Sequence, residues 1–263
     1  MDLQYASDLH IDHFPGQDFS TFLIPSASVL LLAGDICSAW KPEYSRFIHW
    51  CASLWRYVIL ISGNHEYTCE RSPRTMDETD AEIRRITAPY TNVKFLQNGE
   101  STVIPGTDIR VIGATLWSAV DPAVYEEVVR VKGDYKHTFT NTAMGIRTTT
   151  PMDICALHLY QKAMLHSAMA SSTERVVLMV HHMPSFSFME PSRRAERFAT
   201  CYASADDDLF QHAQIAVVLC GHSHQSLRVR LPTGAVGIMN ARGYKSEAQR
   251  LLHTYSARAT IRV

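Results

Sequence analysis

The chain has 263 residues and a formal net charge of −1. A chain so close to neutral has no general electrostatic attraction to nucleic acid or to an anionic membrane. No apolar stretch approaches the ~18 residues that a membrane span needs. The length suits one α/β domain with a sizeable core, and no repeat, low-complexity tract or Gly/Ser linker divides it, so we predict a single domain over residues 1–263.

Short runs rich in Val, Ile and Leu predict buried strands along the chain. We expect strands at residues 2–6, 29–33, 57–62, 109–113, 176–180, 215–220, 227–231 and 235–239. The Pro105-Gly106 turn between Ser101–Ile104 and Asp108–Ile112 predicts a hairpin. Helical patterns predict helices at 43–56, 78–87, 152–170 and 206–213. The expected fold class is therefore α/β.

Five short polar motifs hold residues typical of metal ligands, and four of them directly follow predicted strands. The motifs are SDLH, AGDI, SGNHE, VHHMP and CGHSH, and their candidate residues are Asp8, His10, Asp35, Asn64, His65, His181, His222 and His224. In an α/β sheet, groups at the carboxyl ends of neighbouring strands converge on one crevice, where ligands bind. The sequence therefore predicts one site built from all five motifs.

The chemistry of these residues favours a pair of divalent metal ions. Asp8 and His10 are two positions apart, so on a strand both side chains would point to the same face. Carboxylate, imidazole and amide ligands without a thiolate suit manganese, zinc or iron. Seven ligands are too many for one such ion and suit two ions if Asp35 is shared. Two ions held together are typical of displacement at phosphorus, which predicts metal-assisted hydrolysis of a phosphate ester.

The order D-x-H, GD, GNH[D/E], H-x-P, GHxH resembles the calcineurin-like metallophosphoesterase superfamily. SDLHID, GNHEY, GATLW, VHHMPS, YAS and NARGY resemble, more closely, one subgroup of small bacterial-type phosphohydrolases. The resemblance implies a two-sheet β-sandwich flanked by helices. It assigns Asp8, His10, Asp35 and His224 to one metal, and Asp35, Asn64, His181 and His222 to the other. Manganese is the expected metal, with iron, zinc or nickel as alternatives.

The resemblance also implies that His65 faces the substrate as a general acid or a charge stabiliser. Many members of the superfamily carry a further Asp three positions after the GD motif, where this chain has Ser38, followed by Ala39. The acid that would orient the catalytic imidazole is thus absent from its usual position. Glu66 or another carboxylate is a candidate substitute.

Several features lie outside the five motifs. Residues 118–150 and 185–204 lack a strong period and are candidate lids or substrate loops, with solvated surface loops as the alternative. Asn240 and Arg242, in NARGY, are candidates for substrate binding, with a turn as the alternative. The remaining histidines are expected to have no role at the site, and His158 and His166 to lie on the surface of their helix; the full set is His13, His49, His137, His158, His166, His212 and His253.

We therefore predict a dimetal hydrolase that cleaves phosphomonoesters or phosphodiesters by attack of a metal-bound hydroxide. The expected partner is a small phosphorylated substrate, with no membrane and no obligate protein partner, and with nucleic acid left open as an alternative. The six cysteines form no C-x-x-C pair and read as reduced thiols, and a ligand at residue 8 leaves no room for a removable signal peptide, so the cytoplasm is the expected location. The alternatives are a non-catalytic scaffold, a nuclease, a small diesterase and a nucleotide pyrophosphohydrolase.

Overall fold

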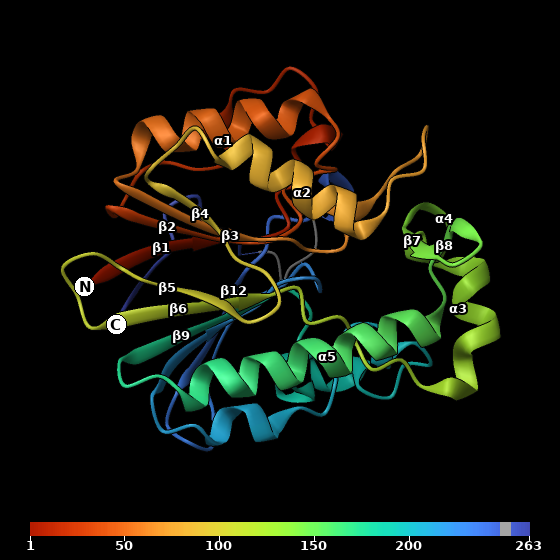
Figure 1. The fold of residues 1–263 in the computed structure, drawn as a ribbon. Helices are drawn as coiled ribbons and strands as arrows, with labels where there is room; N and C mark the ends of the chain where they lie inside the picture. The colour runs from red at the N-terminus through yellow and green to blue at the C-terminus, as the bar shows by residue number, and fades with distance from the viewer. Residues whose placement is uncertain (248–253) are drawn as a thin grey trace.

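Two β-sheets lie face to face, and helices cover the outer face of each sheet (Figure 1). The computed structural model describes residues 1–247 and 254–263, so His253 lies outside the described residues. This arrangement confirms the predicted two-sheet sandwich flanked by helices. The two ends of the chain lie close together, because the first and last strands pair with each other.

The first sheet has the strand order β13-β1-β2-β3-β4. Its strands are β1 (Asp2–Ala6), β2 (Val29–Ala33), β3 (Tyr57–Ile61), β4 (Val93–Phe95) and β13 (Thr260–Arg262). β1 to β4 run parallel, and β13 adds an antiparallel edge. The loops that leave β1, β2 and β3 therefore emerge from the same edge of this sheet.

The second sheet has the order β11-β12-β10-β9-β6-β5. Its strands are β5 (Glu100–Val103), β6 (Ile109–Ala114), β9 (Arg175–Val180), β10 (Ile215–Leu219), β11 (Ser226–Arg230) and β12 (Val236–Asn240). The four central strands are parallel, and β5 and β11 are antiparallel edges. The β5–β6 pairing is the predicted hairpin. A separate two-stranded hairpin is formed by β7 (Phe139–Thr142) and β8 (Gly145–Thr148).

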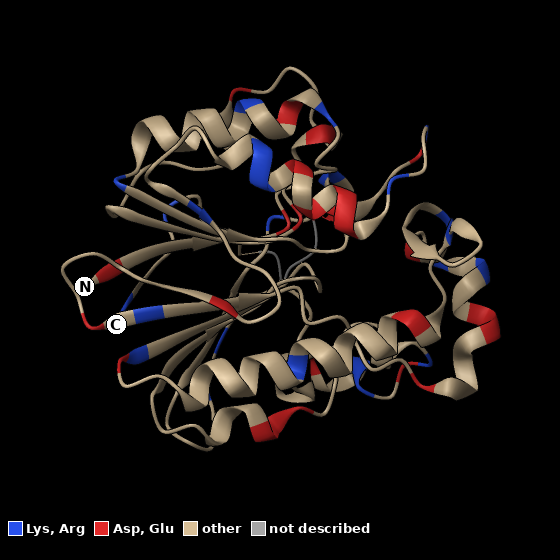
Figure 2. Cartoon of the chain, in the orientation of Figure 1, with Lys and Arg blue, Asp and Glu red and all other residues tan. Residues whose placement is uncertain are grey.

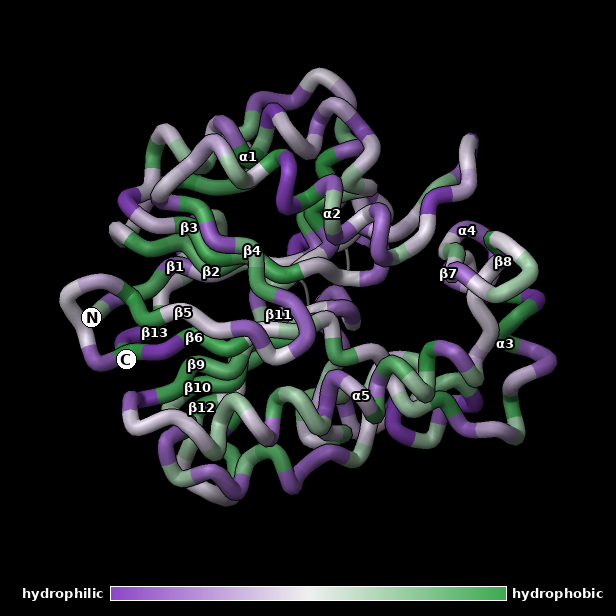
Figure 3. The backbone as a smooth tube through the Cα atoms, viewed as in Figure 1, coloured by the Kyte–Doolittle hydropathy of each residue, from purple (hydrophilic) through white to green (hydrophobic). Residues whose placement is uncertain are grey.

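Apolar side chains from both sheets form one buried layer between them. Leu31 and Ile59 of the first sheet belong to the same cluster as Val177 and Val217 of the second. Figure 3 shows the strands of both sheets as mostly hydrophobic, while Figure 2 shows charged residues concentrated on the helices and loops outside them. Burial of this layer fixes the two sheets against each other.

Three long helices cover the sheets. α1 (Pro42–Leu54) and α2 (Met76–Thr87) pack on the first sheet, and α5 (Pro151–Ala170) packs on the second. α2 begins earlier than predicted because the Thr75 hydroxyl and the Glu78 side chain form a reciprocal capping box. Short 3-10 helices occupy the connections, at Ile11–His13, Phe19–Thr21, His65–Tyr67, Pro122–Val124, Phe186–Phe188, Pro191–Arg193, Ala199–Cys201, Asp207–Gln211 and Lys245–Glu247.

The structure corrects several details of the prediction. The expected helix at 206–213 is the short 3-10 helix Asp207–Gln211, and the short strands β4 and β13 were not predicted. Residues 118–150 contain α3 (Tyr125–Val131), α4 (Asp134–His137) and the β7–β8 hairpin, which are too short to give a clear sequence period. The expectation for His158 is wrong, because its side chain is 2% exposed and its Nδ1 contacts the carbonyl of Trp117.

Within residues 1–247 and 254–263, none of the helices combines the length and the apolar character needed to cross a bilayer.

Candidate metal centre

The five polar motifs meet where the parallel strands of both sheets end. The ligand atoms of Asp8, His10, Asp35 and His224 lie within 4.8 Å of one another, and those of Asp35, His181 and His222 do the same. Asp35 belongs to both groups. The structure thus brings together residues that are more than 200 positions apart in the sequence, and the assignment of each residue to an ion stays a prediction.

Short distances link the members of each group. His10 Nε2 lies 3.0 Å from His224 Nε2, and 3.8 Å from Asp35 Oδ2. On the other side, the same Asp35 oxygen lies 3.3 Å from His181 Nε2. Asn64 Oδ1 lies 3.1 Å from that His181 nitrogen, which places the amide oxygen beside the second group. One carboxylate oxygen therefore stands between the two sets of imidazoles.

Left-handed backbone turns aim the side chains inward. Five of the candidate ligands have a positive φ: Asp8 (52°), His10 (43°), Asp35 (56°), His222 (67°) and His224 (53°). Residues other than glycine seldom adopt this backbone conformation because it is strained. Residues that do adopt it concentrate at functional sites. Asp8 and His10 thus converge through two turns beyond the end of β1, not through the alternation along a strand that the sequence suggested.

Two glycines of the motifs are required by close approach. A Cβ atom at Gly63 would lie 2.7 Å from His181 Nε2, and one at Gly221 would lie 2.5 Å from Asp8 Oδ2. No real Cβ atom tolerates such contacts, so a side chain at either position would push a candidate ligand out of place. The glycine before each Asn or His in these motifs is therefore part of the site.

In three of the candidate histidine ligands, one ring nitrogen contacts an oxygen atom of the protein, which leaves the other nitrogen for a metal ion. His181 Nδ1 donates to the carbonyl of Ala33 at 2.8 Å, and His224 Nδ1 lies 2.6 Å from Glu247 Oε2. His222 Nε2 lies 3.3 Å from the carbonyl of Cys201. Metal-binding histidines are oriented in this way, with one nitrogen bonded to an oxygen and the other turned toward the ion.

The charges in the site also suit cations. Asp8 and Asp35 are at most 1% exposed. Burial alone would lower the pKa of His181, but the charge of Asp35 outweighs it and raises that pKa to about 10. Burial holds the pKa of His10 and of His222 well below the usual range. Both are therefore neutral imidazoles, which is the form that binds metals.

Glu66 is buried and joins the loops of β2 and β3. Its carboxylate accepts the backbone N–H groups of Asp35 (2.9 Å), Ile36 (2.8 Å) and Gly63 (2.7 Å). Burial and then the charge of Asp35 raise the pKa of Glu66 to about 8, and the N–H donors oppose that rise. Because its oxygens are committed to the backbone, Glu66 does not orient the His65 imidazole, the role for which the sequence made it a candidate. It fixes the turn that presents Asp35.

His65 and Asn64 have partners that the sequence did not reveal. The backbone N–H of His65 donates to Asp35 Oδ1 at 2.8 Å, and its Nε2 lies 3.1 Å from the Tyr244 hydroxyl. Asn64 Nδ2 donates to Asp134 Oδ1 at 2.8 Å. That bond turns the amide oxygen of Asn64 toward His181, as a ligand would require.

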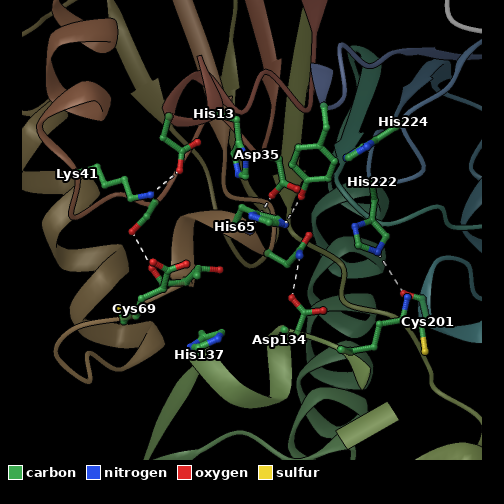
Figure 4. A pocket seen from close by; sticks show the side chains of 18 of the residues that line it. His13, Asp35, Lys41, His65, Cys69, Asp134, His137, Cys201, His222 and His224 are labelled. Atoms are coloured by element: carbon green, nitrogen blue, oxygen red, sulfur yellow. Dashed lines mark hydrogen bonds and ion pairs between the residues drawn. The ribbon is translucent and has the colours of Figure 1, made fainter. Parts of the chain in front are cut away.

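The site opens into a cavity of about 1370 Å³. Figure 4 shows Asp35, His65, His222 and His224 grouped within it, with Lys41, Cys69 and His137 further out. Both irregular segments contribute to its wall: 118–150 through Lys132, Gly133, Asp134 and His137, and 185–204 through Glu190, Arg193, Glu196, Cys201 and Tyr202. His13 also lines the cavity. Apart from Tyr202, which stands in YAS, these residues lie in none of the motifs, because the tertiary fold alone brings them to the site.

Asn240 and Arg242 lie outside the lining of this cavity. Asn240 is 2% exposed, and its side-chain amide donates to the carbonyls of Tyr5 and Ser256. The Arg242 guanidinium lies 3.8 Å from the centre of the Phe14 ring and 4.2 Å from that of Phe22. Both side chains therefore have packing partners within the protein, and their contact with substrate stays a prediction. Their segment reaches the site through its backbone, since Gly243 N–H donates to the Asp8 carbonyl at 2.9 Å.

The chain belongs to the calcineurin-like phosphoesterase family, whose model matches residues 6–226. It is similar to uncharacterized protein L509 of Acanthamoeba polyphaga mimivirus, with 21% identity over 93% of this chain and 92% of that protein. Its fold is similar to the crystal structure of phosphopantetheinyl hydrolase from Mycobacterium tuberculosis, with a TM-score of 0.72, 17% identity, and coverage of 98% and 95% of the two chains. The protein is accordingly a metal-dependent phosphoesterase, and its buried Asp/His cluster suits a binuclear site.

The packing of Arg242 leads to a testable prediction. Arg242→Lys replaces a flat guanidinium against two aromatic rings with a compact ammonium, which cannot stack in the same way. A cation–π contact is worth about 0.5–2 kcal/mol, so we expect the melting temperature to fall by a few degrees. Calorimetry of the variant and elemental analysis of its metal should show lower stability with unchanged metal content. A raised KM at an unchanged melting temperature would return Arg242 to substrate binding.

Proposed function

We propose that the protein is a dimetal phosphoesterase that hydrolyses a phosphodiester or phosphomonoester in the cavity described above. The observation that carries this proposal is the position of Asp35, one buried carboxylate shared by two separate groups of ligand atoms. Such sharing is what a pair of adjacent ions requires. We assign Asp8, His10, Asp35 and His224 to one ion, and Asp35, Asn64, His181 and His222 to the other. Manganese is the proposed metal, with iron, zinc or nickel as alternatives, because carboxylate, imidazole and amide ligands without a thiolate suit such ions.

When bound, two divalent ions would lower the pKa of a water molecule and neutralise charge on the phosphoryl oxygens. The protein contributes fixed positions for the reacting groups. His65 lines the cavity beside Asp35, where its imidazole can donate a proton or a hydrogen bond to an oxygen of the phosphate ester. The hydrogen bond from Asn64 Nδ2 to Asp134 holds the Asn64 side chain in one orientation, with its amide oxygen directed toward the proposed metal site. This preorganisation stabilises the transition state at no cost of rearrangement.

The cavity supports a substrate larger than a simple phosphate. Ligand sites commonly have volumes of about 300–1,000 Å³, and this cavity exceeds that range. Lys132 stands on its wall, with its Nζ 2.5 Å from the Tyr202 hydroxyl and 4.0 Å from the centre of the Tyr202 ring. In the described part of the chain, Lys132 has no ion pair with a carboxylate. We therefore propose that it binds an anionic part of the substrate.

Two other classes of function fit less well. A non-catalytic scaffold would not need a full set of metal ligands that is buried and oriented by hydrogen bonds to other protein groups. A nuclease would need a basic groove with stacked aromatics, whereas carboxylates such as Glu43, Glu70 and Glu190 line this cavity together with its cations. We therefore keep a small phosphorylated substrate as the proposal. We also propose that the protein works in the cytoplasm and needs no obligate protein partner.

A substrate panel supplied with manganese tests the function. It should include p-nitrophenyl phosphate, bis-p-nitrophenyl phosphate, cyclic nucleotides, dinucleotides and, because of the name of the mycobacterial neighbour, a phosphopantetheinyl ester. We expect metal-dependent hydrolysis, abolished by chelation and restored by manganese. A protein that binds two ions and hydrolyses nothing in the panel would favour the scaffold.

The shared ligand predicts unequal losses of metal. Asp35→Ala removes a ligand from both ions, so it should hold less metal than Asp8→Ala or His181→Ala, each of which removes a ligand from one. Elemental analysis after equal metal loading measures this, with His49→Ala, remote from the cavity, as the control. Two ions retained by Asp35→Ala would contradict the assignment.

His65 is proposed to contact substrate and not metal. His65→Ala should therefore keep its metal, while kcat falls by roughly 10²–10⁴-fold, the usual loss of a general acid or base. Steady-state kinetics and elemental analysis on the same sample decide the matter. If the variant loses metal, His65 is a ligand and the division of roles is wrong.

A further inference from the structure

Tyr244 occupies the centre of the histidine cluster. Its ring stacks on His10 at 4.4 Å between centroids, and lies 4.8 Å from the rings of both His13 and His224. Its hydroxyl lies 3.1 Å from His65 Nε2. Tyr244 belongs to the NARGY motif. None of the residues of this motif is a proposed metal ligand.

The hydroxyl stands where an orienting group is otherwise missing. Ser38 and Ala39 follow the GD motif, and the Ser38 hydroxyl is turned away, donating to the carbonyl of Thr68 at 2.7 Å. Glu66 is committed to three backbone N–H groups. Within residues 1–247 and 254–263, the hydrogen-bond partner of the His65 ring is the Tyr244 hydroxyl.

Tyr244 is itself held firmly. Its backbone N–H donates to Glu247 Oε2 at 2.9 Å, and the same oxygen lies 2.6 Å from His224 Nδ1. The N–H of Gly243 donates to the carbonyl of Asp8. The segment is therefore fixed to two candidate ligands, and the stacking on His10 fixes the plane of the ring. A side chain anchored in this way can hold another one in a set orientation.

We propose that Tyr244 is the positioning residue of His65, in place of the absent carboxylate. Its hydroxyl donates to Nε2 and holds the imidazole in one orientation, with the ring hydrogen on Nδ1. Nδ1 then keeps its proton and donates a hydrogen bond to the oxygen that leaves phosphorus, which takes its own proton from water. A carboxylate bonded to the same nitrogen would hold the opposite tautomer, because it accepts a hydrogen bond where the hydroxyl donates one. The expected effect on kcat rests on the proposed function, whereas the expected tautomer of His65 is independent of it.

Tyr244→Phe keeps the ring and its stacking and removes only the hydroxyl. We expect kcat to fall about tenfold or more, with KM within about twofold and metal content and melting temperature unchanged, since only orientation is lost. The loss should be larger for phenyl phosphate than for p-nitrophenyl phosphate, because the nitro group spreads the charge of the leaving oxygen over its ring and that oxygen gains less from a hydrogen bond. Added to His65→Ala, the substitution should cost little more, because both act through one imidazole.

Tyr90→Phe is the matched control. The Tyr90 hydroxyl lies 3.1 Å from His49 Nδ1, which is also a contact between a phenol and an imidazole nitrogen at the same distance, but on the outer surface of the molecule. This variant should retain wild-type kcat for both substrates. An equal loss in both variants would show a general effect of removing a hydroxyl and would overturn the proposal.

Nitrogen-15 spectra of the histidine rings test the tautomer without any turnover. In zinc-loaded protein, the His65 signals, identified by their absence in His65→Ala, should show a protonated Nδ1 and an unprotonated Nε2. In Tyr244→Phe this pattern should shift toward the Nε2-protonated form. Unchanged signals, or an Nε2-protonated wild type, would overturn the proposal even if the enzyme is active. Inactivity of the wild type on both phosphates, with the expected spectra, would count against the proposed function and not against the positioning role.

Discussion

The buried carboxylate of Asp35 is the constraint on which the site depends. It lies at the end of β2 in a left-handed turn, where one oxygen accepts the His65 N–H and the other faces the imidazoles of His10 and His181. A buried charge is tolerated only when it is paired, and here the partners come from both sheets. The sandwich therefore closes around a negative charge that a pair of cations would neutralise.

Buried polar groups around this charge keep the loops in place. Glu66 ties the loop after β3 to the loop after β2, and Asp8 accepts the backbone N–H of His222 at 2.9 Å, which joins the first sheet to the second. These bonds satisfy backbone groups that the sharp turns would otherwise leave unpaired. These hydrogen bonds thus help to offset the backbone strain of the candidate ligands that have a positive φ.

The metal centre and the cavity wall have different origins in the fold. The candidate ligands stand at the ends of central strands, which the core holds rigidly. The wall comes from residues 118–150 and 185–204, which pack on each other through Lys132–Tyr202 and through the ion pair of Arg197 with Glu127. Such connecting segments can vary without disturbing the sheets, so we expect them to set substrate preference while the ligands set the reaction.

The sequence by itself determined the class of protein, the central strands of both sheets and the ligand motifs. It could do so because buried strands have a recognisable apolar pattern and because each motif follows such a strand within a few residues. The tertiary structure alone decided that Tyr244 reaches His65, that Glu66 binds backbone, that Arg242 stacks on Phe14 and that His158 is buried. Tyr244 and His65 are separated by 179 positions. Contacts between such distant side chains depend on how the sheets and loops pack in three dimensions, and no local period of the sequence records them.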